Sequence, residues 1–296
     1  LVLQFMPVGS AIIADRYTYL PYIGFFYIAG WLIDRYAKGN FSRSYHFNIP
    51  IAVIMGILTF IQCGIWLNGA TLWDHAIKTQ PSARAYLNRG SLYKDEKKYQ
   101  EAIQCFNEAL KINVADHEAY MLRGNVYFEM NKADLAFSDY KKSLSIKPNY
   151  STALDNLGAL FGLRLQYDSA LVYLNRALAI SPGYSPSYKN RGLVNLELNK
   201  NEDAIRDFKK FLEYNPNDPD IMNVIGVCYR NLGKYNDALT IINQAIAIKP
   251  DPHFFLNRAY CYNGLKDIES ARKDALKAKA GGLNIDPVFA RSLGIQ

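Results

Sequence analysis

The sequence predicts an all-α protein in which two transmembrane helices precede a superhelix of six helical hairpins and a short capping helix. Three observations support this: two long apolar runs near the start, small residues that recur every 34 positions afterwards, and a helix-start motif near the end. We expect a membrane segment at 1–73, a linker at 74–82, six hairpins at 83–280 and a C-terminal cap at 281–296.

The two apolar runs cover residues 17–33, which carry no charge, and residues 49–67, whose polar side chains are Thr59 and Gln62. At about 1.5 Å per residue, both reach across a hydrocarbon core of about 30 Å, the first only just. Aromatic residues stand where interfacial side chains would: Tyr22, Tyr27, Trp31, Trp66 and Trp73. They favour membrane spans over the alternative, a buried hairpin of a soluble protein.

The segment between the two runs carries Arg35, Lys38 and Arg43 against Asp34. Short loops rich in lysine and arginine tend to stay in the cytoplasm. We therefore expect an integral membrane protein whose hairpins lie outside the cytoplasm, in a periplasm or a lumen.

The rest of the chain repeats itself. One series of small residues is Gly90, Gly124, Gly158, Gly192, Gly226 and Ala259. A second is Ala102, Ala136, Ala170, Ala204, Ala238 and Ala271, and the closing prolines are Pro148, Pro182, Pro216 and Pro250. Small residues at this period mark points where paired helices approach closely, and proline ends the second helix. The pattern resembles the tetratricopeptide repeat (TPR), whose hairpins stack into an α-solenoid.

The C-terminal residues contain a helix-start motif. Asp286 is a suitable N-cap, Pro287 suits the first helical position, and Gly294 suits the residue past the end. We expect a short helix here that covers the end of the array.

Charged residues are matched between the two helices of some hairpins. The expected ion pairs are Arg123 with Asp139, Arg191 with Asp207, and Arg258 with Asp274. Where the arginine position is apolar, at Leu157 and Ile225, the partner position is not acidic. An unpaired half-buried guanidinium is costly, so we interpret these pairs as structural.

Arg89 breaks this rule, because the matching position in its hairpin is Cys105. Two interpretations stay open: Arg89 is free to bind a ligand, or it contacts the membrane-proximal segment.

The helical register predicts which side chains line a groove along the first helices. Those of chief interest are Leu87, Lys94, Met121, Asn125, Phe128, Asp155, Lys189, Leu193, Asn223, Arg230, Tyr260 and Asn263. The set mixes apolar and polar residues and lacks the lysine-then-asparagine spacing that resembles a carboxylate clamp. An extended peptide or a folded protein surface is the expected partner, rather than a C-terminal carboxylate.

Composition and motifs indicate no chemistry in this chain. It has no Walker loop, nucleophile elbow, HExxH or dinucleotide motif, so no catalytic residue and no cofactor is expected. Its four cysteines and four histidines are too scattered for a metal site. The net charge of +7 comes from lysines and arginines interspersed with acids, which argues against nucleic acid as a partner.

The run ADRYTYLPYIGFF at 14–26, followed by a second span that leads into hairpins, resembles the transmembrane and tetratricopeptide repeat-containing family. Its bacterial relatives look like lipid-linked-sugar glycosyltransferases of the GT-C fold. The resemblance implies a multispanning enzyme that transfers a sugar, often mannose, from a polyprenyl or dolichyl phosphate to protein. It also implies that the hairpins present the acceptor and that the catalytic acids lie in an upstream loop.

Only Asp15, Arg16 and Tyr17 carry over from this resemblance, as candidates to contact a lipid phosphate at the outer membrane face. The alternative for Arg16 is an interfacial anchor paired with Asp15.

Two functions therefore remain open. The chain is either the C-terminal, acceptor-binding part of a lipid-linked-sugar-dependent protein glycosyltransferase, or a non-enzymatic, membrane-tethered scaffold for assembling envelope complexes. Pro21 and Gly24 within the first span favour the former for a parent protein, since helix breakers in a span need neighbouring helices.

Overall fold

The computed structural model describes Arg35, residues 53–54, residue 57 and residues 68–295. The expected spans at 17–33 and 49–67, apart from Val53, Ile54 and Ile57, lie outside this part of the chain, as do Asp15, Arg16 and Tyr17. Within the described part, no helix combines the length and the apolar character that crossing a membrane requires.

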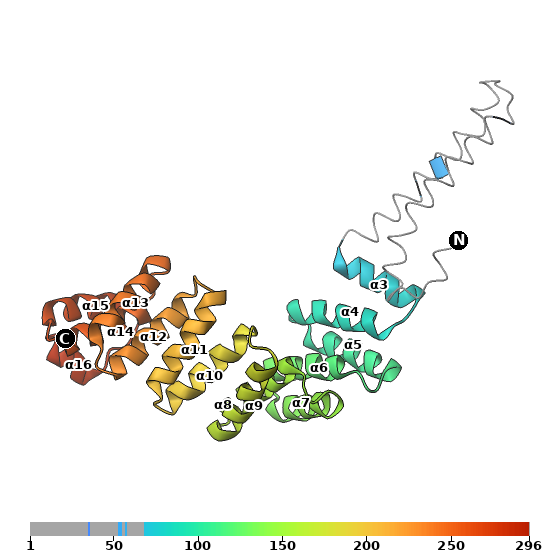
Figure 1. Cartoon of the computed structure of the whole chain (residues 1–296). Coiled ribbons are helices and arrows are strands. Elements are labelled where there is room, and N and C mark those ends of the chain that lie inside the picture. The colour runs from blue at the N-terminus through green and yellow to red at the C-terminus, as the bar shows by residue number, and fades with distance from the viewer. Residues whose placement is uncertain (1–34, 36–52, 55–56, 58–67, 296) are drawn as a thin grey trace. The chain divides into compact units, whose positions relative to one another are not determined.

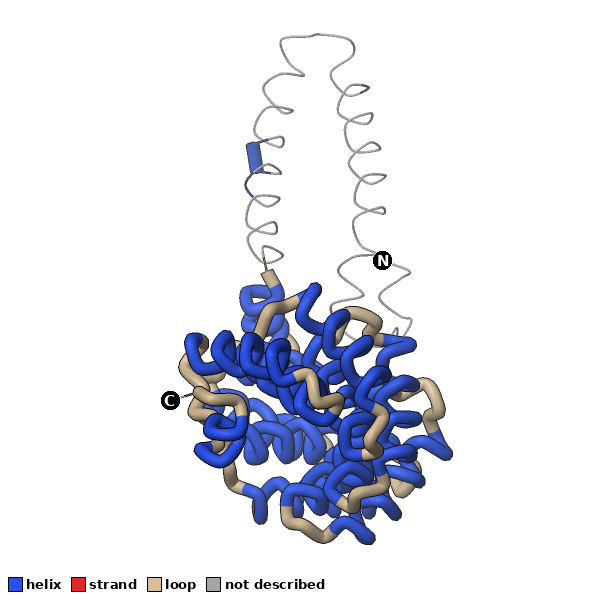
Figure 2. The backbone as a smooth tube through the Cα atoms, turned by 90° about the vertical axis from the view of Figure 1, so that its left-hand side faces the viewer, coloured by secondary structure: helices blue, strands red, loops and turns tan. Residues whose placement is uncertain are grey.

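Residues 68–295 form helices joined by short loops, and the described chain contains no strand (Figure 2). One compact unit holds α3 (Gly69–Thr79), α4 (Ala83–Asp95), α5 (Tyr99–Ile112), α6 (His117–Glu129) and α7 (Ala133–Ile146). A second holds α8 (Ser151–Leu163), α9 (Tyr167–Ile180), α10 (Ser185–Glu197), α11 (Asn201–Tyr214), α12 (Pro219–Asn231), α13 (Tyr235–Ile248), α14 (Pro252–Gly264), α15 (Ile268–Ala280) and α16 (Pro287–Ser292).

The expected all-α array of six hairpins is confirmed. Hairpins 1 to 6 are the pairs α4 and α5, α6 and α7, α8 and α9, α10 and α11, α12 and α13, and α14 and α15 (Figure 1). Within each unit, the second helix of one hairpin also packs on the first helix of the next. Each apolar face is thereby buried against its neighbours, as expected for a solenoid.

The repeating small residues are the contact points between the two helices of a hairpin. A Cβ added at Gly192 would lie 2.7 Å from Cε1 of Phe208, which is fully buried. Gly90 stands in the same relation to Phe106, also at 2.7 Å. Glycine lets the two backbones approach until the aromatic ring of the second helix rests on the first.

The loop inside each hairpin uses a single residue in the left-handed backbone region. These residues are Lys97, Asn131, Leu165, Asn199, Gly233 and Lys266, with φ between 57° and 72°. The turn closes with a backbone bond such as Lys98 N–H to Tyr93 O, at 2.8 Å. Only Gly233 adopts this conformation without the steric cost of a Cβ, about 1 kcal/mol or more in the other five.

Helix α3 precedes the first hairpin and packs on α4. Its N-cap, Asn68, accepts a hydrogen bond from the Thr71 backbone N–H at 2.9 Å, and Thr71 Oγ1 accepts one from the Asn68 N–H. The segment 74–82, expected as a linker, is therefore helical as far as Thr79.

The C-terminal capping helix is confirmed as α16. Asp286 accepts hydrogen bonds from the backbone N–H groups of Val288 and Phe289, at 3.0 and 2.9 Å. Phe289, Leu293 and Ile295 are buried against Ala259, Ala271 and Ala275 of the last hairpin. The apolar end of the array is thus covered.

Candidate interaction surface and pocket

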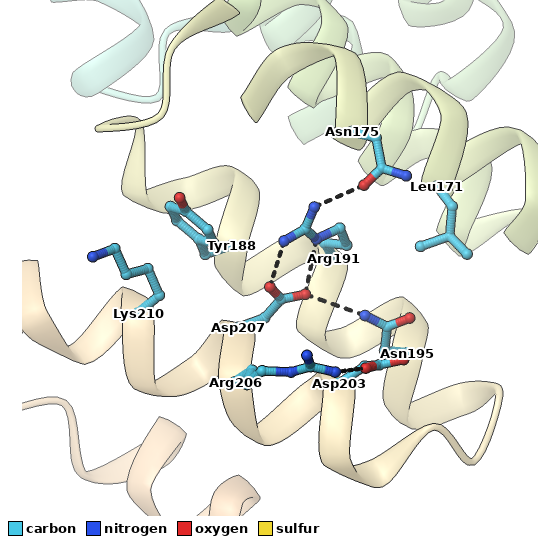
Figure 3. Close-up of a pocket in the computed structure, with 9 residues that line it drawn as sticks. All are labelled: Leu171, Asn175, Tyr188, Arg191, Asn195, Asp203, Arg206, Asp207 and Lys210. Carbon is cyan, nitrogen blue, oxygen red and sulfur yellow. Dashed lines mark hydrogen bonds and ion pairs between the residues drawn. The ribbon is translucent and has the colours of Figure 1, made fainter. Parts of the chain in front are cut away.

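Arg191 and Asp207 join the two helices of hairpin 4. Nε and Nη2 of Arg191 donate to the two carboxylate oxygens of Asp207, at 2.9 and 2.6 Å (Figure 3). These bonds raise the pKa of Arg191, because they favour its charged form more than burial disfavours it. The same two-bond geometry holds Arg123 to Asp139 and Arg258 to Asp274.

Each of these arginines also reaches back to the preceding hairpin, a contact that the sequence interpretation missed. Nη1 of Arg191 donates to Oδ1 of Asn175 in α9, at 2.7 Å. Asn107 and Asn243 accept the same bond from Arg123 and Arg258, at 2.5 and 2.6 Å. Each arginine thus connects three helices. The sequence feature that could have indicated this contact is the spacing of the three asparagines, which stand 68 residues, or two repeats, apart.

Arg89 contacts the helix before the hairpins. Its Nε and Nη2 donate to Asp74 of α3, at 2.6 and 3.2 Å, and Nη2 also donates to the Tyr93 hydroxyl at 2.9 Å. Of the two interpretations left open for Arg89, the structure supports contact with the segment that precedes the hairpins, here helix α3. Its Nη1 is buried without a hydrogen-bond partner.

The twelve residues expected to line a groove differ in exposure. Leu87, Met121, Asp155 and Asn223 are buried, whereas Phe128 and Leu193 are exposed. The rest are half-buried: Lys94, Asn125, Lys189, Arg230, Tyr260 and Asn263. Asp155 and Asn223 are covered because the first helix of the following hairpin packs over each of them. They therefore support this face and offer little surface themselves.

Asp155 is 2% exposed, and both of its oxygens accept hydrogen bonds from Nδ2 of Asn190 in α10, at 3.0 and 3.1 Å. No cation is paired with it among the described residues. Burial raises the pKa of this carboxyl, and the hydrogen bonds from Asn190 oppose the rise.

Two cations on the first-helix face of the second unit have no carboxylate partner within the described chain. Arg230 donates to Oδ1 of Asn257 at 3.3 Å and lies over the Tyr260 ring, 5.3 Å from its centroid. Asn257 in turn donates to Asn223 at 3.1 Å. Nζ of Lys189 lies 5.5 Å from the centroid of the Phe211 ring. This face therefore combines positive charge, carboxamides and the exposed Leu193.

A pocket of about 530 Å³ lies between α9, α10 and α11 (Figure 3). It is lined by Leu171, Asn175, Tyr188, Arg191, Asn195, Asp203, Arg206, Asp207 and Lys210. Arg206 pairs with Asp203, and Lys210 pairs with Glu213 at 2.6 Å. Sequence interpretation did not identify this pocket.

The described residues show no group of three or more histidines, cysteines or acids placed to hold a metal ion. Cys228 and Cys261 are fully buried, and burial raises the pKa of each thiol to about 11. Neither thiol is therefore activated as a nucleophile.

Residues 83–114, 117–150 and 195–259 each match a family model described as "Tetratricopeptide repeat". Two curated proteins are similar over part of the chain. The protein O-mannosyl-transferase tmtc2 of Xenopus laevis is 29% identical over 129 residues, and TMTC2 of Mus musculus is 30% identical over 130. Each match covers 39% of this chain and 15% of the relative's length.

Among solved structures, the pilF protein of Pseudomonas aeruginosa is similar, with a TM-score of 0.63 and 21% identity. The match covers 72% of this chain and 96% of that protein. At this identity the likeness supports the fold alone, and it agrees with the three family models. Residues 83–114, 117–150 and 195–259 of this chain are tetratricopeptide repeats.

Proposed function

We propose that the hairpin array is a protein-binding module and forms the acceptor-binding part of a lipid-linked-sugar-dependent protein glycosyltransferase. The partial similarity to two protein O-mannosyl-transferases supports this, together with the family resemblance of the run at 14–26. In this proposal the two apolar segments anchor the chain in a membrane. The hairpins lie outside the cytoplasm, and Asp15, Arg16 and Tyr17 contact a polyprenyl-phosphate sugar.

The observation that carries the protein-binding part is the first-helix face of hairpins 4 to 6. Lys189 and Arg230 have no carboxylate partner in the described chain, and Leu193 between them in sequence is 39% exposed. The half-buried carboxamide of Asn257, which Asn223 holds from below at 3.1 Å, is suited to the backbone of an extended segment. The face therefore fits an acceptor segment that carries acidic and apolar side chains.

The charge of this face can be reversed without touching the core. We expect Lys189→Glu with Arg230→Glu to reduce capture of acceptor proteins at least tenfold, measured by crosslinking in membranes that contain the full protein. Lys234→Glu with Lys266→Glu, at exposed hairpin turns, is the matched control and should leave capture unchanged. Equal capture by the first double variant and wild type would move the binding surface elsewhere.

Sugar transfer in the same membranes separates the two functions left open by the sequence. If capture and mannose incorporation into acceptors fall together, the acceptor-binding role is supported. If capture falls while mannose incorporation stays at the wild-type level, the chain is a membrane-tethered scaffold instead.

A further inference from the structure

The residue three positions after the small position of each hairpin is aromatic in five hairpins out of six. The column reads Tyr93, Tyr127, Phe161, Asn195, Tyr229 and Tyr262. Hairpin 4 is the exception, and the pocket described above lies beside its Asn195.

In hairpins 1, 2 and 6, the first helix carries an arginine that bonds an aspartate of a neighbouring helix. The aromatic ring of the column lies beside the guanidinium of that arginine. The carbon Cζ of Arg89 is 3.8 Å from the centroid of the Tyr93 ring. The corresponding distances are 5.9 Å from Arg123 to Tyr127 and 6.0 Å from Arg258 to Tyr262. All three lie within the range of a cation–π contact, about 6 Å. Arg191 has Tyr188 of its own helix at 5.7 Å from its Cζ, as Arg123 has Tyr120 and Arg258 has Phe255, both at 5.5 Å. It lacks the second ring that Arg123 and Arg258 have, because Asn195 occupies that position.

Asn195, which stands where the other hairpins have a ring, is part of the pocket wall. Its side chain is 6% exposed, and its Nδ2 donates to Oδ2 of Asp207 at 3.1 Å, which fixes the amide against α11 (Figure 3). The pocket volume of about 530 Å³ is within the range of pockets that bind small organic groups, about 300–1,000 Å³.

The hydrogen-bonding edge of Arg191 is already occupied. Nε and Nη2 bond Asp207, and Nη1 bonds Asn175. What the guanidinium still offers to the pocket is the part of its flat face that Tyr188 does not cover, and such a face attracts aromatic rings. Leu171 supplies an apolar contact, while Asp203 and Asn195 supply oxygens that can accept a hydrogen bond.

We propose that this pocket binds an aromatic side chain of a partner protein, with tyrosine preferred because the lining can accept its O–H. The incoming ring takes the place that the aromatic column fills in the other five hairpins, and it stacks on Arg191. The pocket residues of α10 are Tyr188, Arg191 and Asn195, which form a different stripe of the helix from Lys189 and Leu193. This site is therefore separate from the charged face and does not depend on the glycosyltransferase proposal.

The test uses p-cresol, which has the ring and hydroxyl of a tyrosine side chain, and the full chain. Saturation-transfer difference NMR reports the contact as signal on the probe's ring protons. We expect a clear signal with wild type and with Asn195→Ala, which leaves the pocket open. Asn195→Tyr, which restores the column, should reduce the signal at least fivefold. Isobutanol, an aliphatic probe, should give at most a fifth of the p-cresol signal.

A second blocking variant guards against a folding defect in the first. Leu171→Trp fills the pocket from α9, and circular dichroism establishes that each variant retains its helices. The proposal is overturned if wild type gives no signal, if either folded blocking variant gives the wild-type signal, or if isobutanol is saturated as strongly as p-cresol.

Discussion

Asp74 of α3 accepts hydrogen bonds from both Nε and Nη2 of Arg89 in α4, at 2.6 and 3.2 Å. Hairpin 1 has Cys105 where hairpins 2, 4 and 6 have the partner aspartate, so α3 supplies the missing carboxylate. Arg89 is 8% exposed, and Asp74 is its one ion-pair partner within the described residues. Helix α3 is therefore an integral part of the array.

Asp74→Ala should destabilise the first unit by about 2 kcal/mol. Removing one partner of a fully buried pair costs about 3–5 kcal/mol, and the cost here is smaller because the Asp74 side chain is 56% exposed. Hydrogen exchange of the α3 and α4 amides measures the effect. Lys78→Ala, on the exposed side of the same helix, is the control and should change exchange little. Equal exchange in Asp74→Ala and wild type would show that α3 is held by its apolar contacts alone.

The bridging arginines show how far sequence interpretation reached. The period of 34 placed Arg191 opposite Asp207, because residues within one hairpin share a fixed register. The bond from Arg191 to Asn175 was missed, since it depends on how successive hairpins pack rather than on the repeat itself. The contact of Asp74 with Arg89 was missed because Asp74 lies before the first repeat, where the period of 34 gives no register.

The ion pair of hairpin 4 can be exchanged for an apolar pair. Hairpin 5 has Ile225 and Ile241 at the equivalent positions, so the fold accommodates both kinds of pair. We expect Arg191→Leu alone to lower the melting temperature of the chain by several degrees, because Asp207 is left buried without its cation. Arg191→Leu with Asp207→Ile should recover most of that loss, as calorimetry can establish.

The double-mutant cycle measures the coupling between the two side chains. Residues in one ion pair typically show interaction energies of about 0.5–3 kcal/mol. Simple additivity of Arg191→Leu and Asp207→Ile would exclude a stabilising pair. The distant change Lys266→Ala provides a reference, since it should add to either single variant without coupling.

The candidate surface was predictable only in part. Helical register placed Leu193 of α10 and Arg230 of α12 on the same face of the array. A period of 3.6 residues fixes which side chains of each helix share a face. Register alone could not show that Asp155 is buried, since Asn190 of the next hairpin covers it. The pocket at Asn195 was detectable as a break in an aromatic column, but its volume depends on the packing of three helices.

Buried thiols give a second measure of packing. Cys228 and Cys261 are 0% exposed, and burial raises the pKa of each to about 11, so less than about one thiol in a thousand is ionised at pH 7.5. We expect alkylation of both residues by iodoacetamide, followed by mass spectrometry, to be at least a hundredfold slower in the folded chain than in urea. Cys105 is only half-buried and should react faster than either. Equal rates for Cys228 in the two conditions would contradict the packing of hairpin 5.

Asp155 predicts a pH dependence of stability with a definite sign. Burial raises the pKa of its carboxyl above the usual 3.8, so the folded state holds the proton more tightly than the unfolded chain. The stability that comes from this group is complete below pH 3.8 and is lost as the pH rises through the folded-state pKa. Asp155→Asn removes the titration.

The melting temperature of Asp155→Asn minus that of wild type should therefore become more positive, by a few degrees, between pH 4 and pH 7. Comparing the same two proteins at each pH cancels the titration of every other group. It also removes any constant effect of the new amide on the bonds to Asn190. Asp168→Asn, at an exposed position of the next helix, is the matched control for replacing an aspartate by asparagine. A difference for Asp155→Asn that shrinks as the pH rises would mean that the hydrogen bonds from Asn190 outweigh burial.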